Sequence, residues 1–377
     1  MFMKSYTCHK FINDLIGDGL KILIFNWRDI KNPAAGGAEV FTHEIAKRLV
    51  AQGHTISFFT SAFDGCRKNE TFDGIEFFRS GNRYTVYLEA RKYYKKHIGQ
   101  FDVVIDEINT IPFMTPDFIK DGTPIVALIH QLAREFWFLE TKFPINMLGY
   151  HYFEDRWLKK YLDIPTLTVS NSTKQDLIDL GFKDIFIIPE GLNIKPLDSL
   201  PEKEKDPTFI FVGRMGHAKR PDHVVKAFSY IREKRLDAKL WMVGDGAMRK
   251  QLEAMNPEGV TFFGYVSQEK KHKLMSRAHA ILVPGVREGW GLVVTEANAM
   301  GTPAIGYNIH GLRDSIKDGE TGLLCDPNPE GMAERAFEFM RDTDMQVRFS
   351  ENALEWAREF DWTKSADEFL KTMELVI

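Results

Sequence analysis

The sequence has few cysteines, no long apolar run and almost no excess charge, and each shortage excludes a class of protein. The three cysteines, Cys8, Cys66 and Cys325, form no Cys-x-x-Cys pair among 377 residues. This spacing argues against a cysteine-based metal or redox site and favours a reducing compartment. No stretch approaches the roughly 18 apolar residues that a membrane-spanning helix needs. Because 49 Lys and Arg stand against 53 Asp and Glu, we expect no electrostatic binding of nucleic acid.

The rest of the composition is that of a globular protein. Hydrophobic residues make up 44% of the chain and charged residues 27%, which is ordinary for a folded protein with a buried core. At about 150 residues a domain, the length predicts two domains. Residues 1–19 lack the apolar core and cleavage site of a signal peptide, so we expect them to be an N-terminal extension on a cytoplasmic protein.

Short apolar runs alternate with amphipathic stretches in the first half of the chain. A helix is expected over 38–52. Strands are expected at 21–25, 55–59, 102–105, 125–129 and 166–169. Strands separated by helices predict βαβ units and a parallel sheet that is covered on both faces. The first domain is expected to span residues 20–195.

The second half repeats this alternation after a charged segment with several prolines, residues 196–207, which predicts a linker. Strands are expected at 208–212, 239–243, 260–263, 280–283 and 303–305, and helices at about 222–233, at about 248–255 and from about 292. The fold class is therefore α/β, with two Rossmann-like, doubly wound domains, the second over 208–362. Ligands of such sheets bind outside the carboxyl ends of the strands, so we expect the chemistry in a cleft between the domains.

The loop after the first strand contains Gly36 and Gly37 just before the expected helix. Two glycines would let the backbone approach a ligand closely, and the start of the helix would offer free amides to an anion. The loop matches neither a Walker A motif nor Gly-x-Gly-x-x-Gly. By itself, the loop favours a tight strand–helix turn over a ligand-binding loop.

Two cations follow the strand at 208–212. Gly213 and Arg214 come directly after the strand, and Lys219 follows before the next helix. Arg is suited to bidentate contact with phosphate oxygens, and Lys acts as a mobile point charge. The plain alternative is that both are solvated surface cations.

The strongest signal is the segment from Glu288 to Glu296, which holds Gly289, Trp290 and Gly291. A helix that starts at Leu292 would direct the amides of Gly291 and Leu292 at an anion. The two glutamates could then accept hydrogen bonds from hydroxyl groups. The alternative for Glu296 is an acid that simply satisfies the helix dipole.

His130 ends a predicted strand at the carboxyl edge of the first sheet. A lone histidine is more often structural than catalytic, but this position makes it a candidate. No cluster of His, Cys, Asp and Glu predicts a metal site. Asp342-Thr343-Asp344 lies after a helix rather than at a strand end, so we do not interpret it as one.

Taken together, these pieces resemble the retaining GT-B glycosyltransferases of family four, the group that includes sucrose synthase and bacterial mannosyltransferases. The matching stretches, in the family's order, are 36–39, His130, 169–173, 188–191, 211–215 with Lys219, 242–246, 263–266, 288–296, 300–303 and 318–323. Trp290 stands where Phe is usual, and Asn193 replaces an expected Asp. Both departures bear on the choice of sugar.

The resemblance implies a donor that is a UDP- or GDP-linked sugar, held mainly by the second domain, and a glycan or lipid-linked acceptor on the first. The implied catalytic residues are His130, Arg214, Lys219 and Glu288. The implied donor-binding residues are Gly36, Gly37, Gly213, Arg214, Lys219, Tyr265, Val266, Glu288, Gly289, Trp290, Gly291, Leu292 and Glu296. The last helix, residues 363–377, is expected to cross back to the first domain.

Within that set, each group has an implied role. Arg214 and Lys219 would bind the diphosphate, and Glu288 would hold the hydroxyls of the transferred sugar. Glu296 would hold the ribose, and the backbone of Tyr265 and Val266 would border the base. His130 would contact the sugar near the reacting carbon.

The chemistry agrees with these roles, because cleavage of a glycosyl–phosphate bond leaves a diphosphate anion. Fixed cations and a helix N-terminus can stabilise that anion without a metal or cofactor. The resemblance implies front-face displacement, in which the departing phosphate takes the proton of the acceptor and the configuration is retained.

A basic and aromatic stretch, residues 83–98, suggests peripheral contact with the inner face of a membrane. Tyr84, Tyr87, Leu88 and Ile98 are expected near one helical face, beside five cations. The sequence slightly favours the alternative, an ordinary surface helix with a solvated charged face.

Two other functions remain open from the sequence. A sugar-nucleotide epimerase of the same architecture would act on the donor alone, and a non-catalytic sensor would bind nucleotide without turnover. A dehydrogenase is disfavoured, because no Gly-x-Gly-x-x-Gly follows the first strand. Paired carboxylates would also suit a glycoside hydrolase, but phosphate-binding elements between Glu288 and Glu296 fit a sugar nucleotide better.

Overall fold

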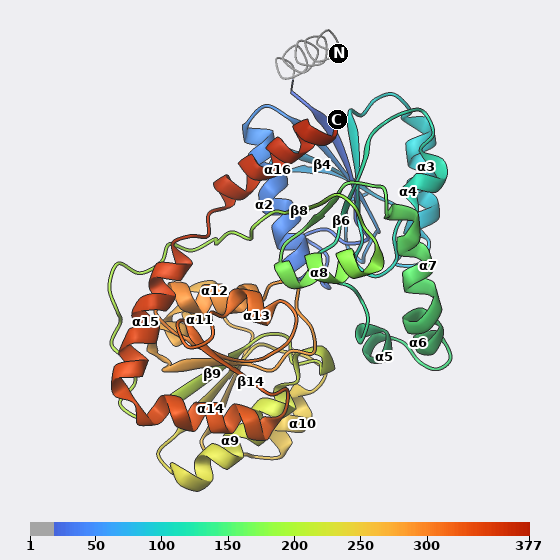
Figure 1. The fold of residues 1–377 in the computed structure, drawn as a ribbon. Helices are drawn as coiled ribbons and strands as arrows, with labels where there is room; N and C mark the ends of the chain where they lie inside the picture. The colour runs from blue at the N-terminus through green and yellow to red at the C-terminus, as the bar shows by residue number, and fades with distance from the viewer. Residues whose placement is uncertain (1–18) are drawn as a thin grey trace. The chain divides into compact units, whose positions relative to one another are not determined.

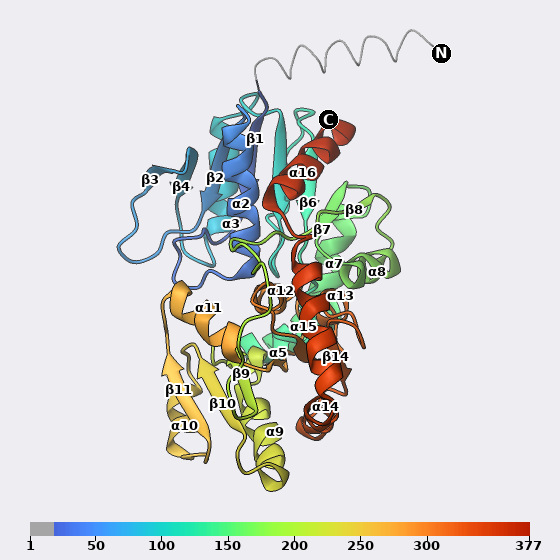
Figure 2. The same cartoon turned by 90° about the vertical axis from the view of Figure 1, so that its left-hand side faces the viewer.

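A computed structural model describes residues 19–377. Apart from Gly19, the expected N-terminal extension lies outside the described residues. Contacts divide the chain into two compact units (Figures 1 and 2). Among the described residues, unit 1 comprises 19–191 together with Trp362–Ile377, and unit 2 comprises Leu192–Asp361.

Residues 19–191 form an eight-stranded sheet with the order β3-β4-β2-β1-β5-β6-β7-β8. Its strands are β1 (Lys21–Phe25), β2 (Thr55–Thr60), β3 (Asn69–Phe72), β4 (Ile75–Arg79), β5 (Val103–Glu107), β6 (Ile125–Leu128), β7 (Thr166–Thr168) and β8 (Ile185–Ile187). All pairs are parallel except β3 with β4. The central strands β1 and β5 are almost wholly buried, as expected when helices cover both faces.

The expectation of a purely parallel first sheet is wrong at its edge. β3 and β4 form a hairpin through Asp73 and Gly74, which both have positive φ, at 50° and 77°. An Asp-Gly pair is well suited to such a two-residue turn, because both positions need left-handed backbone.

The longer helices of unit 1 cover this sheet. Its helices are α2 (Gly37–Ala51), α3 (Val86–Lys96), α4 (Thr115–Phe118), α5 (Phe136–Glu140), α6 (Ile145–Leu148), a π-helical turn (Gly149–Phe153), α7 (Glu154–Leu158), a 3₁₀ turn (Lys159–Tyr161), α8 (Asn171–Leu180) and α16 (Trp362–Val376). Ser170 caps α8 through its hydroxyl, which accepts from Thr173 N, and Gly181 ends α8 in left-handed backbone.

The final helix, α16, packs along α2 in both views (Figures 1 and 2). Trp362 at its start is 1% exposed and meets Phe41 of α2 edge to face, with ring centroids 5.8 Å apart. A side chain on Gly191 would collide with the Trp362 ring. The end of the first segment of unit 1 is therefore closely packed against the start of its second segment. Gln52 and Asp367 are joined by a 2.8 Å hydrogen bond.

Residues 192–361 form a six-stranded sheet, with the order β11-β10-β9-β12-β13-β14 and parallel pairing throughout. Its strands are β9 (Thr208–Val212), β10 (Lys239–Val243), β11 (Val260–Gly264), β12 (Ala280–Val283), β13 (Ala304–Tyr307) and β14 (Gly322–Cys325). Its helices are a 3₁₀ turn (His217–Lys219), α9 (Pro221–Lys234), α10 (Arg249–Ala254), α11 (Gln268–Arg277), α12 (Leu292–Ala299), α13 (Leu312–Ser315), α14 (Pro329–Arg341) and α15 (Thr343–Ala357).

Two apolar clusters cover the two faces of the second sheet. On one face, α9, α10 and α14 pack against alternate residues of the strands, such as Phe209 and Phe211. On the other face, α11, α12 and α13 pack against the intervening residues, such as Ile210 and Ile281. This two-sided burial confirms a Rossmann-like α/β fold in both halves.

The segment expected as a linker, residues 196–207, is part of unit 2. Leu197 N donates to Ala299 O at 2.9 Å, and Glu204 N donates to Arg277 O at 2.9 Å. Lys203 donates to two carbonyl oxygens and to one hydroxyl of unit 2. Among residues 19–377, no helix combines the length and apolar character needed to cross a membrane.

Candidate functional site

In unit 2, the predicted donor residues come from loops on both sides of a topological switch. β9 lies in the middle of the sheet, with β10 on one side and β12 on the other. The chain leaves β9 and β12 in opposite directions, and ligands of such sheets bind outside the carboxyl ends of the strands at a switch of this kind. Val286 N, after β12, donates to Ala218 O, after β9, at 3.0 Å. The two loops are therefore joined directly.

Lys219 and Glu288 are brought into contact at this switch point. Lys219 Nζ lies 2.5 Å from Glu288 Oε1, and the two side chains are 40% and 13% exposed. Glu288 packs so close to Gly285 that a Cβ there would lie 2.7 Å from Oε1. The cation and carboxylate are thus paired, with the cation the more accessible of the two.

The loop that carries Glu288 runs into α12 through Gly291. Gly291 is the N-cap of α12, with left-handed φ of 96°, and a Cβ there would lie 2.9 Å from Leu312. Only glycine fits this conformation and this packing without strain. Leu292 begins the helix as expected, and the first amides of a helix have no partner within it. The helix dipole adds positive potential at this end.

Glu296 pairs with Lys271, which the sequence analysis did not single out. Lys271 Nζ, on α11, lies 2.9 and 2.8 Å from the two Glu296 oxygens. Lys271 is 13% exposed and Glu296 28%. Glu296 is therefore held by a neighbouring helix. No sequence signal distinguished Lys271 from the other cations of α11.

The remaining predicted residues of unit 2 lie at the same edge of the sheet or close to it. Gly213 follows β9 and donates its amide to Val243 O at 3.0 Å, and Arg214 is exposed next to it. Tyr265 is 86% exposed just after β11, and Val266 packs against the apolar cluster beside it. Gly289 and Trp290 lie in the Glu288 loop, where the Trp290 ring meets Phe360 at 5.5 Å.

Two further sequence motifs, Gly244-Asp245-Gly246 and Asp342-Thr343-Asp344, have structural explanations. Gly244 and Gly246 both have positive φ and lie against the backbone of the loop after β9, so they serve a close approach within unit 2. Asp342 caps α15, where its carboxylate accepts from Met345 N at 2.8 Å. Among the described residues, no group of three or more His, Cys, Asp or Glu is arranged to hold a metal ion.

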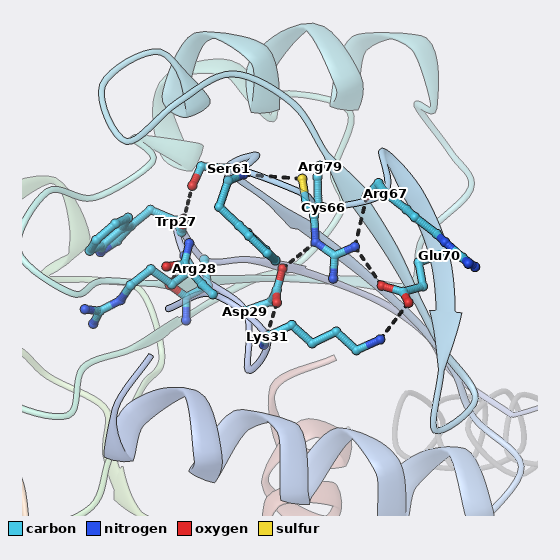
Figure 3. Close-up of polar contacts among 12 residues, drawn as sticks. Trp27, Arg28, Asp29, Lys31, Ser61, Cys66, Arg67, Glu70 and Arg79 are labelled. Atoms are coloured by element: carbon cyan, nitrogen blue, oxygen red, sulfur yellow. Dashed lines mark hydrogen bonds and ion pairs between the residues drawn. The ribbon is translucent and has the colours of Figure 1, made fainter. Parts of the chain in front are cut away.

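In unit 1, the loop after β1 is held by buried charges (Figure 3). Arg79, at the end of β4, donates to Asp29 at 2.7 Å and to Glu70 at 3.0 Å, and Asp29 and Arg79 are both fully buried. Lys31 adds a 2.6 Å hydrogen bond to Glu70. Since breaking a buried pair leaves an uncompensated charge, this network rigidly fixes the segment that precedes Gly36 and Gly37.

Gly36 caps α2, and Gly37 is the first residue of that helix. Gly36 N donates to Glu39 Oε2 at 2.7 Å, and Arg28 donates to Glu39 Oε1 at 3.0 Å. Gly36 has extended backbone, and a Cβ there would meet only Glu39 Oε2, at 3.7 Å. The packing of unit 1 therefore does not itself require a glycine at position 36.

His130 follows β6 and is 6% exposed. Its Nε2 lies 3.5 Å from Glu107 Oε1, at the end of β5. Phe41 contacts the ring edge to face at 5.0 Å, and Thr173 Oγ1 donates to the His130 carbonyl at 3.0 Å. Burial lowers the pKa of His130, but the carboxylates of Glu107, Glu190 and Glu39, with Glu107 first, together raise it above its usual value.

Two acidic residues beside His130 were missed by the sequence analysis. Glu107 extends the strand expected to end at Ile105, and Glu190 follows β8 within a matched stretch. An acid at the carboxyl end of a buried strand was the available signal for Glu107. Nothing in the sequence showed that β6 and β8 would bring His130 and Glu190 together.

The basic stretch at residues 83–98 forms α3 and its flanks. Tyr84, Leu88 and Ile98 are 72%, 64% and 55% exposed. The expectation that Tyr87 shares this face is wrong, because Tyr87 packs inward against Phe113, with ring centroids 4.9 Å apart.

Each half of the chain matches a known family of glycosyltransferases. The family model "Glycosyltransferase Family 4" matches residues 35–195, and "Glycosyl transferases group 1" matches residues 195–356. The N-acetyl-alpha-D-glucosaminyl L-malate synthase of Bacillus anthracis is 25% identical, over 86% of this chain and 89% of its own.

Two solved structures share the fold. Sucrose-phosphate synthase from Thermosynechococcus elongatus superposes with a TM-score of 0.76 at 18% identity, covering 94% of this chain and 98% of its own. HepE of Anabaena, in complex with UDP-glucose, superposes with a TM-score of 0.70 at 16% identity, covering 94% and 99%. The fold and the two family matches together define a glycosyltransferase of the GT-B type. This chain is such an enzyme, with the family 4 part in its first half and the group 1 part in its second.

Proposed function

We propose that this enzyme is a retaining hexosyltransferase that moves a sugar from a UDP- or GDP-linked donor to a glycan or lipid-linked acceptor. The step is a front-face displacement in which the chain's own cations stabilise the leaving diphosphate, without a metal ion or other cofactor. The departing phosphate oxygen takes the acceptor proton as the new glycosidic bond forms, so the configuration at the reacting carbon is retained.

The observation that carries this proposal is the contact between Lys219 and Glu288 at the switch point of unit 2. It brings one cation and one hydroxyl acceptor together from the loops after β9 and β12, next to the start of α12. Lys219 would turn to the diphosphate when a donor binds, and Glu288 would accept hydrogen bonds from the sugar hydroxyls. Their mutual ion pair would hold both side chains at the site beforehand.

Other placements support the same donor. Arg214 lies exposed after β9, where a guanidinium suits a diphosphate. The amides of Gly291 and Leu292 begin a helix, where an anion is favoured. The packing of unit 1 does not require a glycine at position 36. The absence of a side chain there would let a phosphate or an acceptor approach the backbone closely. The solved HepE complex contains UDP-glucose, which supports a nucleotide sugar for this fold.

The acceptor is assigned to unit 1, and His130 is assigned to the transferred sugar. We place the enzyme in the cytoplasm, with contact between residues 83–98 and the inner face of a membrane if the acceptor is a lipid. Exposed Tyr84 and Leu88, beside exposed lysines of α3, support that contact.

The test begins with a panel of UDP- and GDP-linked sugars, screened by thermal stabilisation of the full chain, since a ligand of the folded state raises its stability. Stabilising donors are then incubated with and without a set of glycan and lipid-linked acceptors. Transfer that depends on an acceptor, with the donor's anomeric configuration in the NMR spectrum of the product, supports the proposal. Conversion of the donor without any acceptor would instead identify an epimerase or hydrolase, and binding without turnover would identify a sensor.

A further inference from the structure

Three ionisable side chains are buried together at the carboxyl edge of the first sheet, and only His130 among them was assigned a role above. Glu107 is fully buried and Glu190 is 4% exposed. They come from the end of β5 and the segment after β8, on either side of the position where β6 ends. Buried carboxyl groups without full hydrogen bonding are costly, so their presence needs an explanation.

Glu107 is only partly satisfied by the protein around it. Its Oε2 accepts a 2.8 Å hydrogen bond from Thr42 Oγ1 of α2. Its Oε1 has no hydrogen-bond donor among the described residues, and the nearest cationic partner is His130 Nε2 at 3.5 Å. The carboxylate is thus anchored by one oxygen while the other faces the imidazole.

The neighbouring residue on β5 shows what a structural carboxylate looks like in the same strand. Asp106 is also fully buried, but its oxygens accept from Phe113 N, from Thr115 N and Oγ1, and from Tyr161 OH. Adjacent residues of a strand point to opposite faces. Asp106 therefore serves packing on one face, whereas Glu107 serves His130 on the other.

The charges around His130 favour a single ion pair. From α2, Glu39 contributes a carboxylate that is matched by Arg28 at 3.0 Å. Burial raises the pKa of Glu190 to about 8, with His130 opposing that rise. Burial raises the pKa of Glu107 as well, and His130 opposes that rise. Glu107 Oε1 lies 3.5 Å from His130 Nε2, so Glu107 is the carboxylate placed to compensate a charged His130, because a paired charge costs less to bury than a lone one.

We propose that Glu107 is a positioning residue for His130: it holds the imidazole ring at the sheet edge in its protonated form, ready to donate a hydrogen bond during glycosyl transfer. The inference deepens the proposed function and rests on it for the catalytic part. Hydrogen bonds from a charged donor are stronger than those from a neutral one, so a protonated His130 would stabilise negative charge on a sugar or phosphate oxygen. Glu107 itself touches neither substrate.

The first measurement needs no substrate. The full chain is labelled in its histidine rings, and the signal of His130 is assigned by its loss in His130→Gln. We expect its NMR titration to give a pKa above that of a free histidine. In Glu107→Gln, the proton affinity of His130 should fall about tenfold or more, because an opposite charge within 6 Å of its ring is lost. In Asp106→Asn, the matched control on the same strand, it should not change. An unchanged titration in Glu107→Gln would overturn the proposal.

The second measurement uses the transfer assay over a range of pH. We expect kcat to fall as the pH rises through the pKa of His130, and this alkaline limb should move to lower pH in Glu107→Gln, with the donor KM little changed. Glu107→Asp, which keeps the charge on a shorter side chain, should restore part of the wild-type profile and serves if the Gln variant does not fold. A lowered pKa with an unmoved alkaline limb would overturn the positioning role. Absence of transfer by the wild type with every donor would refute the proposed function instead, and the NMR titration would still decide the pairing.

Discussion

Glu296 and Lys271 form an ion pair in which one ammonium reaches both carboxylate oxygens, at 2.9 and 2.8 Å. Glu296 lies on α12 and Lys271 on α11, so the residue assigned to the ribose is held by a side chain from another helix. The pair is mostly shielded from water, which makes it stronger than an exposed ion pair.

The first prediction concerns this pair. Glu296→Gln should weaken the binding of a nucleoside diphosphate sugar, because the charge and one of the two acceptor oxygens for the ribose hydroxyls are lost. Lys271→Met should weaken it through misplacement of Glu296. Since the two residues act together, the double variant should lose less than the sum of the single losses. Titration calorimetry of the three variants measures this, with Lys273→Met on the exposed face of α11 as control. Equal affinity in Glu296→Gln and wild type would refute the ribose role.

The second prediction concerns the leaving group. Lys219→Ala should lower kcat by about 100- to 1,000-fold, as is typical when a fixed group that stabilises developing negative charge is removed. Arg214→Ala should also remove most turnover. Lys226→Ala, an exposed lysine on α9, is the control and should retain wild-type rates. Near-normal turnover in Lys219→Ala would contradict the diphosphate assignment.

The third prediction concerns pH and Lys203. Its ammonium is surrounded by Ser276 O, Gly301 O and Thr302 Oγ1 at 2.8–3.0 Å, and burial lowers its pKa to about 7. Between pH 7 and the usual value near 10.4, the unfolded chain then binds more protons than the folded chain. The contribution of Lys203 to stability should therefore rise with pH across this window.

That contribution is measured as a difference between proteins. Urea midpoints of wild type and Lys203→Met are compared at pH 6.5 and pH 9, which cancels the other titrating groups. The advantage of the wild type should be larger at pH 9. Lys205→Met, an exposed neighbour, should show no such trend, and a constant difference for Lys203→Met would show that its pKa is not lowered.

The fourth prediction concerns the return of the chain to unit 1. Trp362 is 1% exposed and fills the space between Phe41 and Gly191. Trp362→Ala should lower the free energy of unfolding of unit 1 by about 3–5 kcal/mol, because it removes a large buried ring and leaves a cavity. Denaturant unfolding followed by circular dichroism measures this. Leu375→Ala, at a position that is 76% exposed, should change little.

The fifth prediction concerns α3. Replacing Lys92, Lys95 and Lys96 by Gln should weaken binding to vesicles that contain anionic lipid, by about 1 kcal/mol of binding free energy per cation. Co-sedimentation with the vesicles measures this binding. A matched triple change in unit 2, at Lys226, Lys234 and Lys239, should have no effect. If the wild-type chain binds anionic and neutral vesicles equally weakly, α3 is an ordinary surface helix.

Local signals in the sequence were enough for the elements that carry the site. The apolar runs predicted β9, β10 and β12 with the observed bounds, and Gly291 before an apolar stretch correctly predicted the start of α12. These features depend on neighbouring residues only, through hydrophobic spacing and the backbone freedom of glycine. The hairpin at Asp73-Gly74 was missed although its turn signal was present, because β3 and β4 alternate only weakly between apolar and polar residues.

The sequence by itself determined the class of fold and placed Lys219, Glu288 and His130 at the carboxyl ends of their strands, because strand ends can be read from local pattern. Only the tertiary structure decided which charges meet: Lys271 with Glu296, and Glu107 with His130. Those partners are 25 and 23 residues apart and lie on different elements. Strand order and helix packing, which no local pattern specifies, bring them together.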